Sequence, residues 1–114
     1  MATLTVQQVT RVGAAPTFAA CTGGGDACPV SASTYIEVKN TSGAPITVTL
    51  AVTAAAPPGL TYATESFSVP ATTGDILYGP ILPQLFADPT TGMCTITYSG
   101  VTNLTIGAFN LAPV

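Results

Sequence analysis

Three cysteines carry the most reactive groups of this sequence, and two of them flank a run of glycines. Cys21 and Cys28 enclose the segment CTGGGDAC, whereas Cys94 stands far along the chain. A bridge between Cys21 and Cys28 would close a short loop that the glycines can accommodate, and the loop-closure entropy would stabilise the fold by about 2.5 kcal/mol. Because the number of cysteines is odd, at least one thiol is left over or pairs with another chain.

The residues alone leave three arrangements of these disulfide candidates open. The first is the Cys21–Cys28 bridge with Cys94 free, and the second is at least one disulfide between chains. The third keeps every thiol reduced, as is usual for a protein made in the cytosol. Cys94 alternates with Ile96 on a predicted strand, so we expect it to be a buried thiol.

Catalytic and metal-binding groups are scarce. The chain has no histidine, so a Ser or Thr nucleophile lacks its usual base. The carboxylates are scattered, and we predict that the protein is not an enzyme. Zinc sites need four Cys or His ligands at tight spacing, and calcium loops need several acidic residues at alternate positions. Asp26 alone cannot supply them, so we predict neither metal nor cofactor.

Two further motifs have structural explanations. The glycine run lacks the lysine ending of a phosphate-binding loop and precedes no helix, which indicates a flexible loop. The triplets 40–42 (NTS) and 103–105 (NLT) match the glycosylation pattern. In a threonine-rich chain we interpret them as chance occurrences.

The composition describes one small domain with very few charges. Of the 114 residues, 47% are hydrophobic and 6% are charged, and the net charge is −3. A basic surface for nucleic acid or for a membrane is therefore excluded. A folded monomer of this size exposes about 5,800 Å², which leaves one charge per ~800 Å². We expect hydroxyl and amide side chains to wet part of this surface and other subunits to cover the rest.

Alternation with period two dominates the chain and predicts an all-β protein. The pattern favours a single-domain antiparallel β-sandwich spanning residues 1–114, Ig-like or jelly-roll-like, with seven to nine short strands. Residues 1–32 are predicted to form an extended N-terminal arm and a glycine-rich loop, with 12–32 irregular. Strands 34–39 and 46–53 are predicted to pair as a hairpin. The other strands are predicted at 3–9, 60–63, 65–69, 75–78, 84–86, 93–99 and 103–109.

Three segments carry a resemblance to a known group of proteins. ATLTVQQVTRVGAAPTFAA, YIEVKNTSGAPITVTL and FSVPATTGDILYGPIL resemble the head decoration proteins of tailed bacteriophages, also called cement or auxiliary capsid proteins. The resemblance implies a non-enzymatic structural protein of the virion, made in the host cytoplasm. It implies binding to the outside of the capsid. The implied partners are the major capsid protein and copies of the protein itself, often in a trimer. It implies no catalytic residues, and the cysteines depart from the family's pattern.

Two other functions compete with this one. A strand–NxSGxP–strand pattern also occurs in Ig-like modules, so an extracellular adhesin or fibre module is the main alternative. The tyrosines at 35, 62, 78 and 98, together with the phenylalanines, could form a sugar-binding platform. In a chain without tryptophan, core packing is the better explanation of most of them. The N-terminal sequence lacks the basic start and apolar stretch of a signal peptide, so we expect synthesis in the cytosol.

Overall fold

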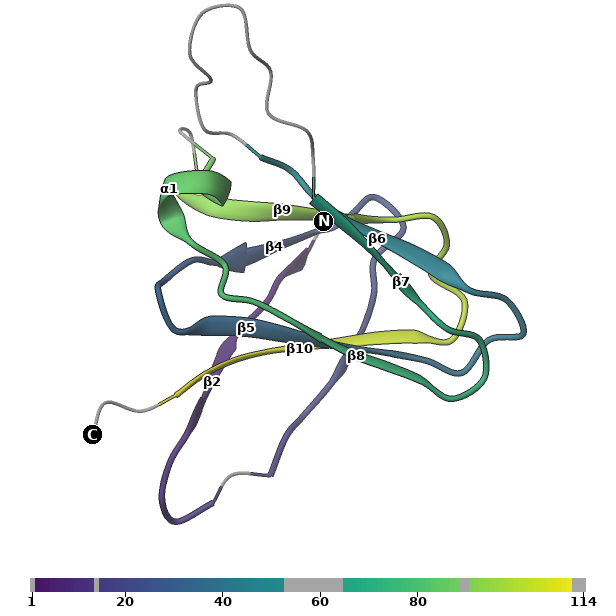
Figure 1. Ribbon diagram of the computed structural model, residues 1–114, viewed down its shortest axis with the longest axis horizontal. Helices are drawn as coiled ribbons and strands as arrows, with labels where there is room; N and C mark the ends of the chain where they lie inside the picture. Colours follow the sequence, from purple (N-terminus) through teal and green to yellow (C-terminus); the bar gives the residue numbers. More distant parts are fainter. Residues whose placement is uncertain (1, 14, 53–64, 89–90, 112–114) are drawn as a thin grey trace, which may run out of the picture.

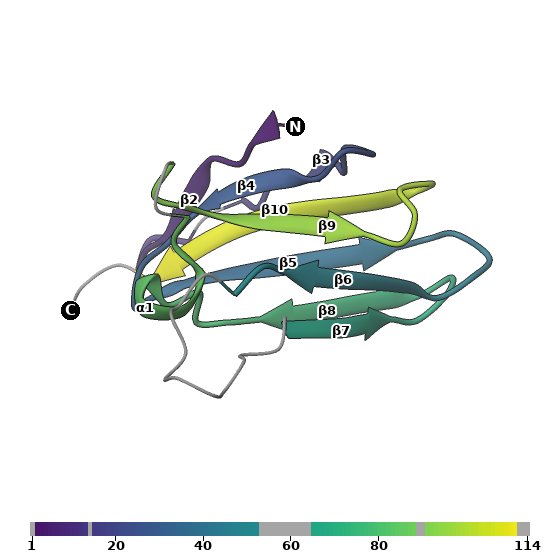
Figure 2. The ribbon, with the colours of Figure 1, turned by 90° about the horizontal axis from the view of Figure 1, so that it is seen from above.

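The chain folds into two five-stranded β-sheets that lie one over the other (Figure 1). The computed structural model describes residues 2–13, 15–52, 65–88 and 91–111. Sheet A has the strand order β1-β4-β9-β6-β7, and sheet B has the order β2-β10-β5-β8, with β3 also paired to β10. Figure 2 shows both orders from above.

The strands are short, as the spacing of turn residues predicts. Sheet A contains β1 (Ala2–Thr3), β4 (Asp26–Pro29), β6 (Ile46–Leu50), β7 (Glu65–Val69) and β9 (Met93–Tyr98). Sheet B contains β2 (Val6–Val9), β3 (Ala19–Ala20), β5 (Thr34–Asn40), β8 (Gly74–Tyr78) and β10 (Leu104–Leu111). The prediction of a single-domain all-β sandwich is confirmed.

The core consists of the inward-facing residues of both sheets. Along β5 buried positions alternate strictly with half-buried ones, and Ile36 and Val38 are fully buried. Val48 and Leu50 of β6 face them from sheet A and are also fully buried. Each fully buried aliphatic side chain contributes about 1.5–3 kcal/mol of hydrophobic free energy, so the two inner faces hold the sandwich together.

The N-terminal segment departs from the predicted single strand. It divides at Leu4, so that β1 pairs with β4 of sheet A and β2 pairs with β10 of sheet B, both in parallel. Leu4 enters the core between them and donates its backbone N–H to Ala27 O at 2.7 Å. The other strand pairs are antiparallel. Because β3 and β4 form inside the segment predicted to be irregular, the described residues contain ten strands and not the predicted seven to nine. The two parallel pairs make the sheets mixed, whereas purely antiparallel sheets were predicted.

The predicted hairpin between 34–39 and 46–53 is wrong, although both strands exist. β5 belongs to sheet B and β6 to sheet A, so the intervening turn crosses from one sheet to the other. Asn40 fixes this crossing: it is fully buried, its Nδ2 donates to Ala44 O (2.9 Å) and Val69 O (3.2 Å), and its Oδ1 accepts from Ser42 N (2.9 Å). Alternation cannot distinguish such an arch from a hairpin, because either connection leaves the strands buried on one side.

Residues 84–86 form a helix and not the predicted strand. The single turn α1 (Pro83–Phe86) begins with a proline, whose fixed φ suits a first helical position. Phe86 donates its N–H to Leu82 O at 3.1 Å and buries its ring, with 2% exposed. The helical turn thus places the Phe86 ring in the core. The predicted strand 60–63 lies outside the described residues.

Candidate functional site

The outer face of sheet B gathers the aromatic and apolar side chains that the core does not use. The pairing register aligns Gln7 with Phe109, Phe109 with Tyr35, and Glu37 with Leu77. Register partners point to the same side of a sheet, so four strands contribute to one surface. We call it the sheet B face, and it consists of Gln7, Val9, Tyr35, Glu37, Lys39, Asp75, Leu77, Phe109 and Leu111, with Phe18 lying over it.

An aromatic cluster forms the centre of the sheet B face. The Phe109 ring stacks on Tyr35 with centroids 5.6 Å apart and meets Phe18 edge to face at 5.9 Å. Lys39 Nζ lies 4.3 Å from the centroid of the Phe18 ring, a cation–π contact. Because these rings cover one another, Phe109 is only 5% exposed. The cluster is therefore a preformed, closely packed surface.

A side-chain clamp holds the segment before β3 onto this face. Gln7 Nε2 donates to Thr17 O at 2.8 Å, and Gln7 Oε1 accepts from Thr17 N at 2.8 Å, so the amide side chain substitutes for a strand neighbour. Gly107 makes the approach possible. A Cβ at this position would lie 2.8 Å from Phe109 Cζ and 3.1 Å from Thr17 O.

A groove with a volume of about 240 Å³ runs beside the aromatic cluster, lined in part by Gln7, Pro16 and Leu77. Leu77 is 63% exposed and Leu111 is 59% exposed. Val12, in the turn that follows β2, is 95% exposed. Val12 lies outside the sheet B face, whereas Leu77 is an exposed apolar side chain that lines a groove, a combination found at interaction sites.

Three of the seven charged residues lie on the same face, namely Glu37, Lys39 and Asp75. Hydrogen bonding with the Asp75 carboxyl group, followed by burial, raises the pKa of Glu37, and the Lys39 charge opposes the rise. Glu37 therefore binds a proton at a higher pH than an isolated glutamate does. Among these three charged residues, Glu37 lines the groove, together with apolar side chains such as Leu77.

The outer face of sheet A has a different composition. Register places one hydroxyl-bearing residue opposite another, as in Thr47 with Ser68 and Thr49 with Thr97. We call this surface the sheet A face, and its residues are Thr3, Ala27, Pro29, Thr47, Thr49, Ser66, Ser68, Met93, Thr95 and Thr97. This set contains neither charged nor aromatic residues, and seven of its ten members carry hydroxyl groups.

The most buried charge of the described chain is Asp26, at the inner side of β4 with 1% exposed. Its carboxylate accepts from Tyr98 Oη (2.6 Å), Thr22 N (3.2 Å) and Ala2 N (3.3 Å). Burial alone would raise the pKa of Asp26, but these three donors outweigh burial and lower it. The ionised carboxylate ties β1, the glycine turn and β9 together.

The glycine run is the turn that carries the chain from β3 in sheet B to β4 in sheet A. Gly25 donates its N–H to Thr22 O at 2.9 Å and has φ of +99°. A Cβ at Gly25 would lie 2.8 Å from Ile96 O. Only glycine fits this position without displacing β9, so the run has a defined structural purpose.

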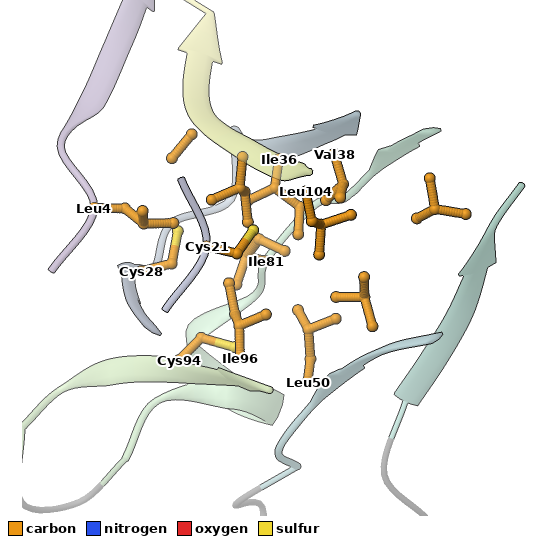
Figure 3. Close-up of a cluster of buried hydrophobic side chains, with 14 of the residues drawn as sticks. Leu4, Cys21, Cys28, Ile36, Val38, Leu50, Ile81, Cys94, Ile96 and Leu104 are labelled. Carbon is orange, nitrogen blue, oxygen red and sulfur yellow. The ribbon is translucent and has the colours of Figure 1, made fainter. Parts of the chain in front are cut away.

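All three cysteines are free thiols in the core, as Figure 3 shows. The structure does not contain the Cys21–Cys28 bridge, and it places Cys28 in register with Cys94 across β4 and β9. Sequence reasoning missed this pair because register depends on the whole sheet. Burial raises the pKa of Cys21 to about 11 and those of Cys28 and Cys94 to about 12. At neutral pH none of them is a nucleophile.

The tyrosines do not form one platform. Tyr78 stacks on Phe67 with centroids 5.0 Å apart at the edge of the core, and Tyr98 binds Asp26. Tyr35 is on the sheet B face, and Tyr62 lies outside the described residues. The amide of Asn40 is buried and already donates twice, so the first glycosylation match has a structural explanation.

Among residues 2–13, 15–52, 65–88 and 91–111, no group of three or more metal-ligating side chains comes together, and no helix has the length and apolarity of a membrane span. No family model, curated protein or solved structure matches the chain.

Proposed function

We propose that the protein is a structural component of a virion, a decoration protein that binds the outside of a tailed-phage capsid and stabilises the lattice of major capsid proteins. One observation carries the proposal. On a domain with very few charges, the sheet B face presents a preformed aromatic cluster, an open groove and exposed leucines, whereas the sheet A face carries hydroxyl groups. This asymmetry is that of a protein with one side for binding and one side for water.

The sheet B face would make the contact with the shell. Burying Leu77 and the open side of the groove removes apolar surface from water at about 25 cal/mol per Å². The three charged side chains lie close together and already interact, so few unpaired ions must lose their water on docking. The occupant we propose is the outer surface of the major capsid protein, with an apolar patch to fill the groove.

Lattice stabilisation follows from linkage. A protein that binds assembled shells and not loose subunits stabilises the assembled state by its binding free energy. Contacts repeated over the symmetric shell add up, and self-association into a small oligomer, which we expect to be a trimer, would raise the avidity of each copy. A modest contact per domain is then sufficient.

The test is reconstitution with shells assembled without this protein, from the phage that encodes it. We expect the protein to sediment with these shells until its binding sites are saturated. We also expect it to raise the temperature at which the shells are disrupted. Bovine serum albumin at equal mass is the control for crowding. A protein that stays in the supernatant and leaves the disruption temperature unchanged would remove the proposal.

A further inference from the structure

Cys28 and Cys94 occupy directly opposite positions on two antiparallel strands. β4 pairs with β9 in the register Ala27 with Thr95, Cys28 with Cys94 and Pro29 with Met93. Both cysteines are fully buried and face the same interior (Figure 3). Opposed residues in antiparallel sheets have Cα atoms about 4.5–5.5 Å apart, within the range of about 4.4–6.8 Å that a disulfide spans.

The neighbouring hydrogen bonds show which kind of pair this is. Ala27 O accepts from Leu4 N on one side, and Thr95 O accepts from Ala51 N on the other. The peptide groups of Ala27 and Thr95 therefore point away from each other. Since N–H and C=O directions alternate along a strand, those of Cys28 and Cys94 point toward each other. Such a hydrogen-bonded pair has the wider Cα spacing of about 5.5 Å, which a disulfide can span. Its side chains lie farther apart than those of a non-hydrogen-bonded pair, so the two Cβ atoms must approach to the roughly 3.5–4.5 Å that the bond requires.

Cys21 occupies a different environment. It precedes the glycine turn, its N–H donates to Leu104 O of β10 at 3.0 Å, and its thiol lies beside Tyr98 and Asp26. The register of sheet A gives Cys21 no opposing cysteine. It is therefore the unpaired thiol among the three.

We propose that Cys28 and Cys94 are the site of an intrachain disulfide across the centre of sheet A, formed under oxidising conditions, with Cys21 left as the free thiol. The oxidant is a small-molecule disulfide such as oxidised glutathione. One cysteine thiolate attacks it and releases one reduced thiol; the second cysteine thiolate then attacks the mixed disulfide and releases another. Two S–H bonds are lost, one S–S bond forms, and the oxidant takes up both electrons.

Formation of the bond requires the two side chains to rotate and the two strands to approach slightly at this pair. Cys28 Sγ donates to Pro29 O at 3.2 Å and Cys94 Sγ to Thr95 O at 3.8 Å, each within its own strand. Rotation about χ1 exchanges these weak contacts for the bond. Because both thiols are buried, the oxidant reaches them when sheet A opens or before it closes in folding, so refolding in a redox buffer forms the bond faster than treatment of the native protein.

The positions of the basic residues allow the bond to be mapped without mutation. Arg11 and Lys39 are the only two basic residues of the chain, so trypsin places Cys21 and Cys28 on fragment 12–39 and Cys94 on fragment 40–114. A second cut on the amino side of Asp26 separates Cys21 from Cys28. The experiment refolds the full chain from urea with oxidised and reduced glutathione, blocks free thiols with an alkylating agent, and applies both cuts before mass spectrometry.

The expected product is a monomer lighter by about 2 Da before alkylation. Its fragment 26–39 is joined to the fragment that holds Cys94, and Cys21 is alkylated. A bond within 12–39, a bond from Cys21 to Cys94, a covalent dimer, or three alkylated thiols would each overturn the proposal. Cys21→Ser is the matched variant, and the same link must persist in it.

Thermal unfolding supplies a second readout. The bond encloses residues 28–94, a loop long enough for the oxidised protein to melt up to about 20 °C above the reduced one by loop-closure arguments. The Cys21→Ser protein must show the same difference. A melting temperature that is equal or lower after oxidation would contradict a bond that fits the native register. The outcome is independent of capsid binding, so it stands or falls separately from the proposed function.

Discussion

The two outer faces of the sandwich are built on the same alternating strands but present opposite chemistry. The sheet A face consists mostly of threonine and serine side chains, whereas the sheet B face carries stacked rings, exposed Leu77 and three charged side chains. Each sheet buries its inner side in the core, and this requirement leaves the composition of its outer side free. The very low charge of this chain therefore has two explanations, one for each side: hydroxyl groups hydrate one face, and we propose that the other makes a contact.

The N-terminal segment connects the two sides. It pairs with sheet A through β1, inserts Leu4 into the core, and then supplies the edge of the sheet B face through Gln7 and Val9. Asp26 binds the start of this segment. A change in the interior of sheet A should therefore affect the sheet B face.

Replacing Asp26 by alanine should have the largest effect. The substitution leaves Tyr98 Oη and the backbone N–H groups of Ala2 and Thr22 without their acceptor, and buried donors left unpaired cost about 3 kcal/mol in total. Urea unfolding measures the loss. Glu65→Gln, which removes a charge from an exposed position of β7, is the control and should change stability by less than about 0.5 kcal/mol. Equal stability of both variants would show that Asp26 anchors nothing.

The same residue predicts a pH dependence. The pKa of Asp26 lies below its ordinary value in the folded protein, so the unfolded chain binds its proton first as the pH falls. Its contribution to stability is therefore complete above the unfolded pKa of about 3.9 and is lost as the pH falls through the lower folded pKa. Urea midpoints of wild type and Asp26→Asn should converge as the pH falls below about 4. Parallel midpoints over that range would contradict an ionised Asp26.

Leu77→Asp tests the difference between the faces directly. A charge in the groove beside Glu37 should weaken binding to shells by about 2 kcal/mol, or roughly 30-fold, because it must be desolvated next to another carboxyl group. Thr49→Asp makes the matched change on the sheet A face and should alter binding less than threefold. Sedimentation titrations measure both. Equal losses would mean that the contact is not confined to sheet B.

Gly107→Ala should disturb the sheet B face from within. The added methyl would lie 2.8 Å from Phe109 Cζ, so the Phe109 ring or the Thr17 backbone must shift. Overpacking of this kind costs about 1–3 kcal/mol, and weaker binding to shells should accompany it. Gly43→Ala, where a Cβ meets nothing within 4 Å, is the control. Unchanged near-ultraviolet dichroism and stability in Gly107→Ala would refute the tight packing.

Lys39→Gln should have the smallest effect. It removes the cation over the Phe18 ring, a contact worth about 0.5–1 kcal/mol at an exposed site. Arg11→Gln removes the same charge from the exposed turn after β2 and is the control. Urea unfolding at low and high salt separates the two. A loss that is the same in both variants would indicate a general charge effect.

The sequence predicted the fold class because the period-two alternation of strands such as ITVTL survives in any sandwich. It could not predict which sheet each strand joins. The predicted β5–β6 hairpin was wrong because Asn40 fixes the crossing between the sheets through a hydrogen bond to Val69, which is distant in sequence. The same limit applied to the sites. Cys28 and Cys94 were candidates by residue type, but their pairing depends on the register of sheet A, and the sheet B face combines residues from four strands.

The central claim is that the sheet B face contacts a capsid. An electron microscopy map of shells reconstituted with the protein tests it most directly. We expect density for the sandwich on the outer surface of the shell. Leu77 and the groove should lie against the major capsid protein, and the threonines of sheet A should face solvent. Sandwich density with the sheet A face against the shell, or shells without added density at saturating protein, would contradict it.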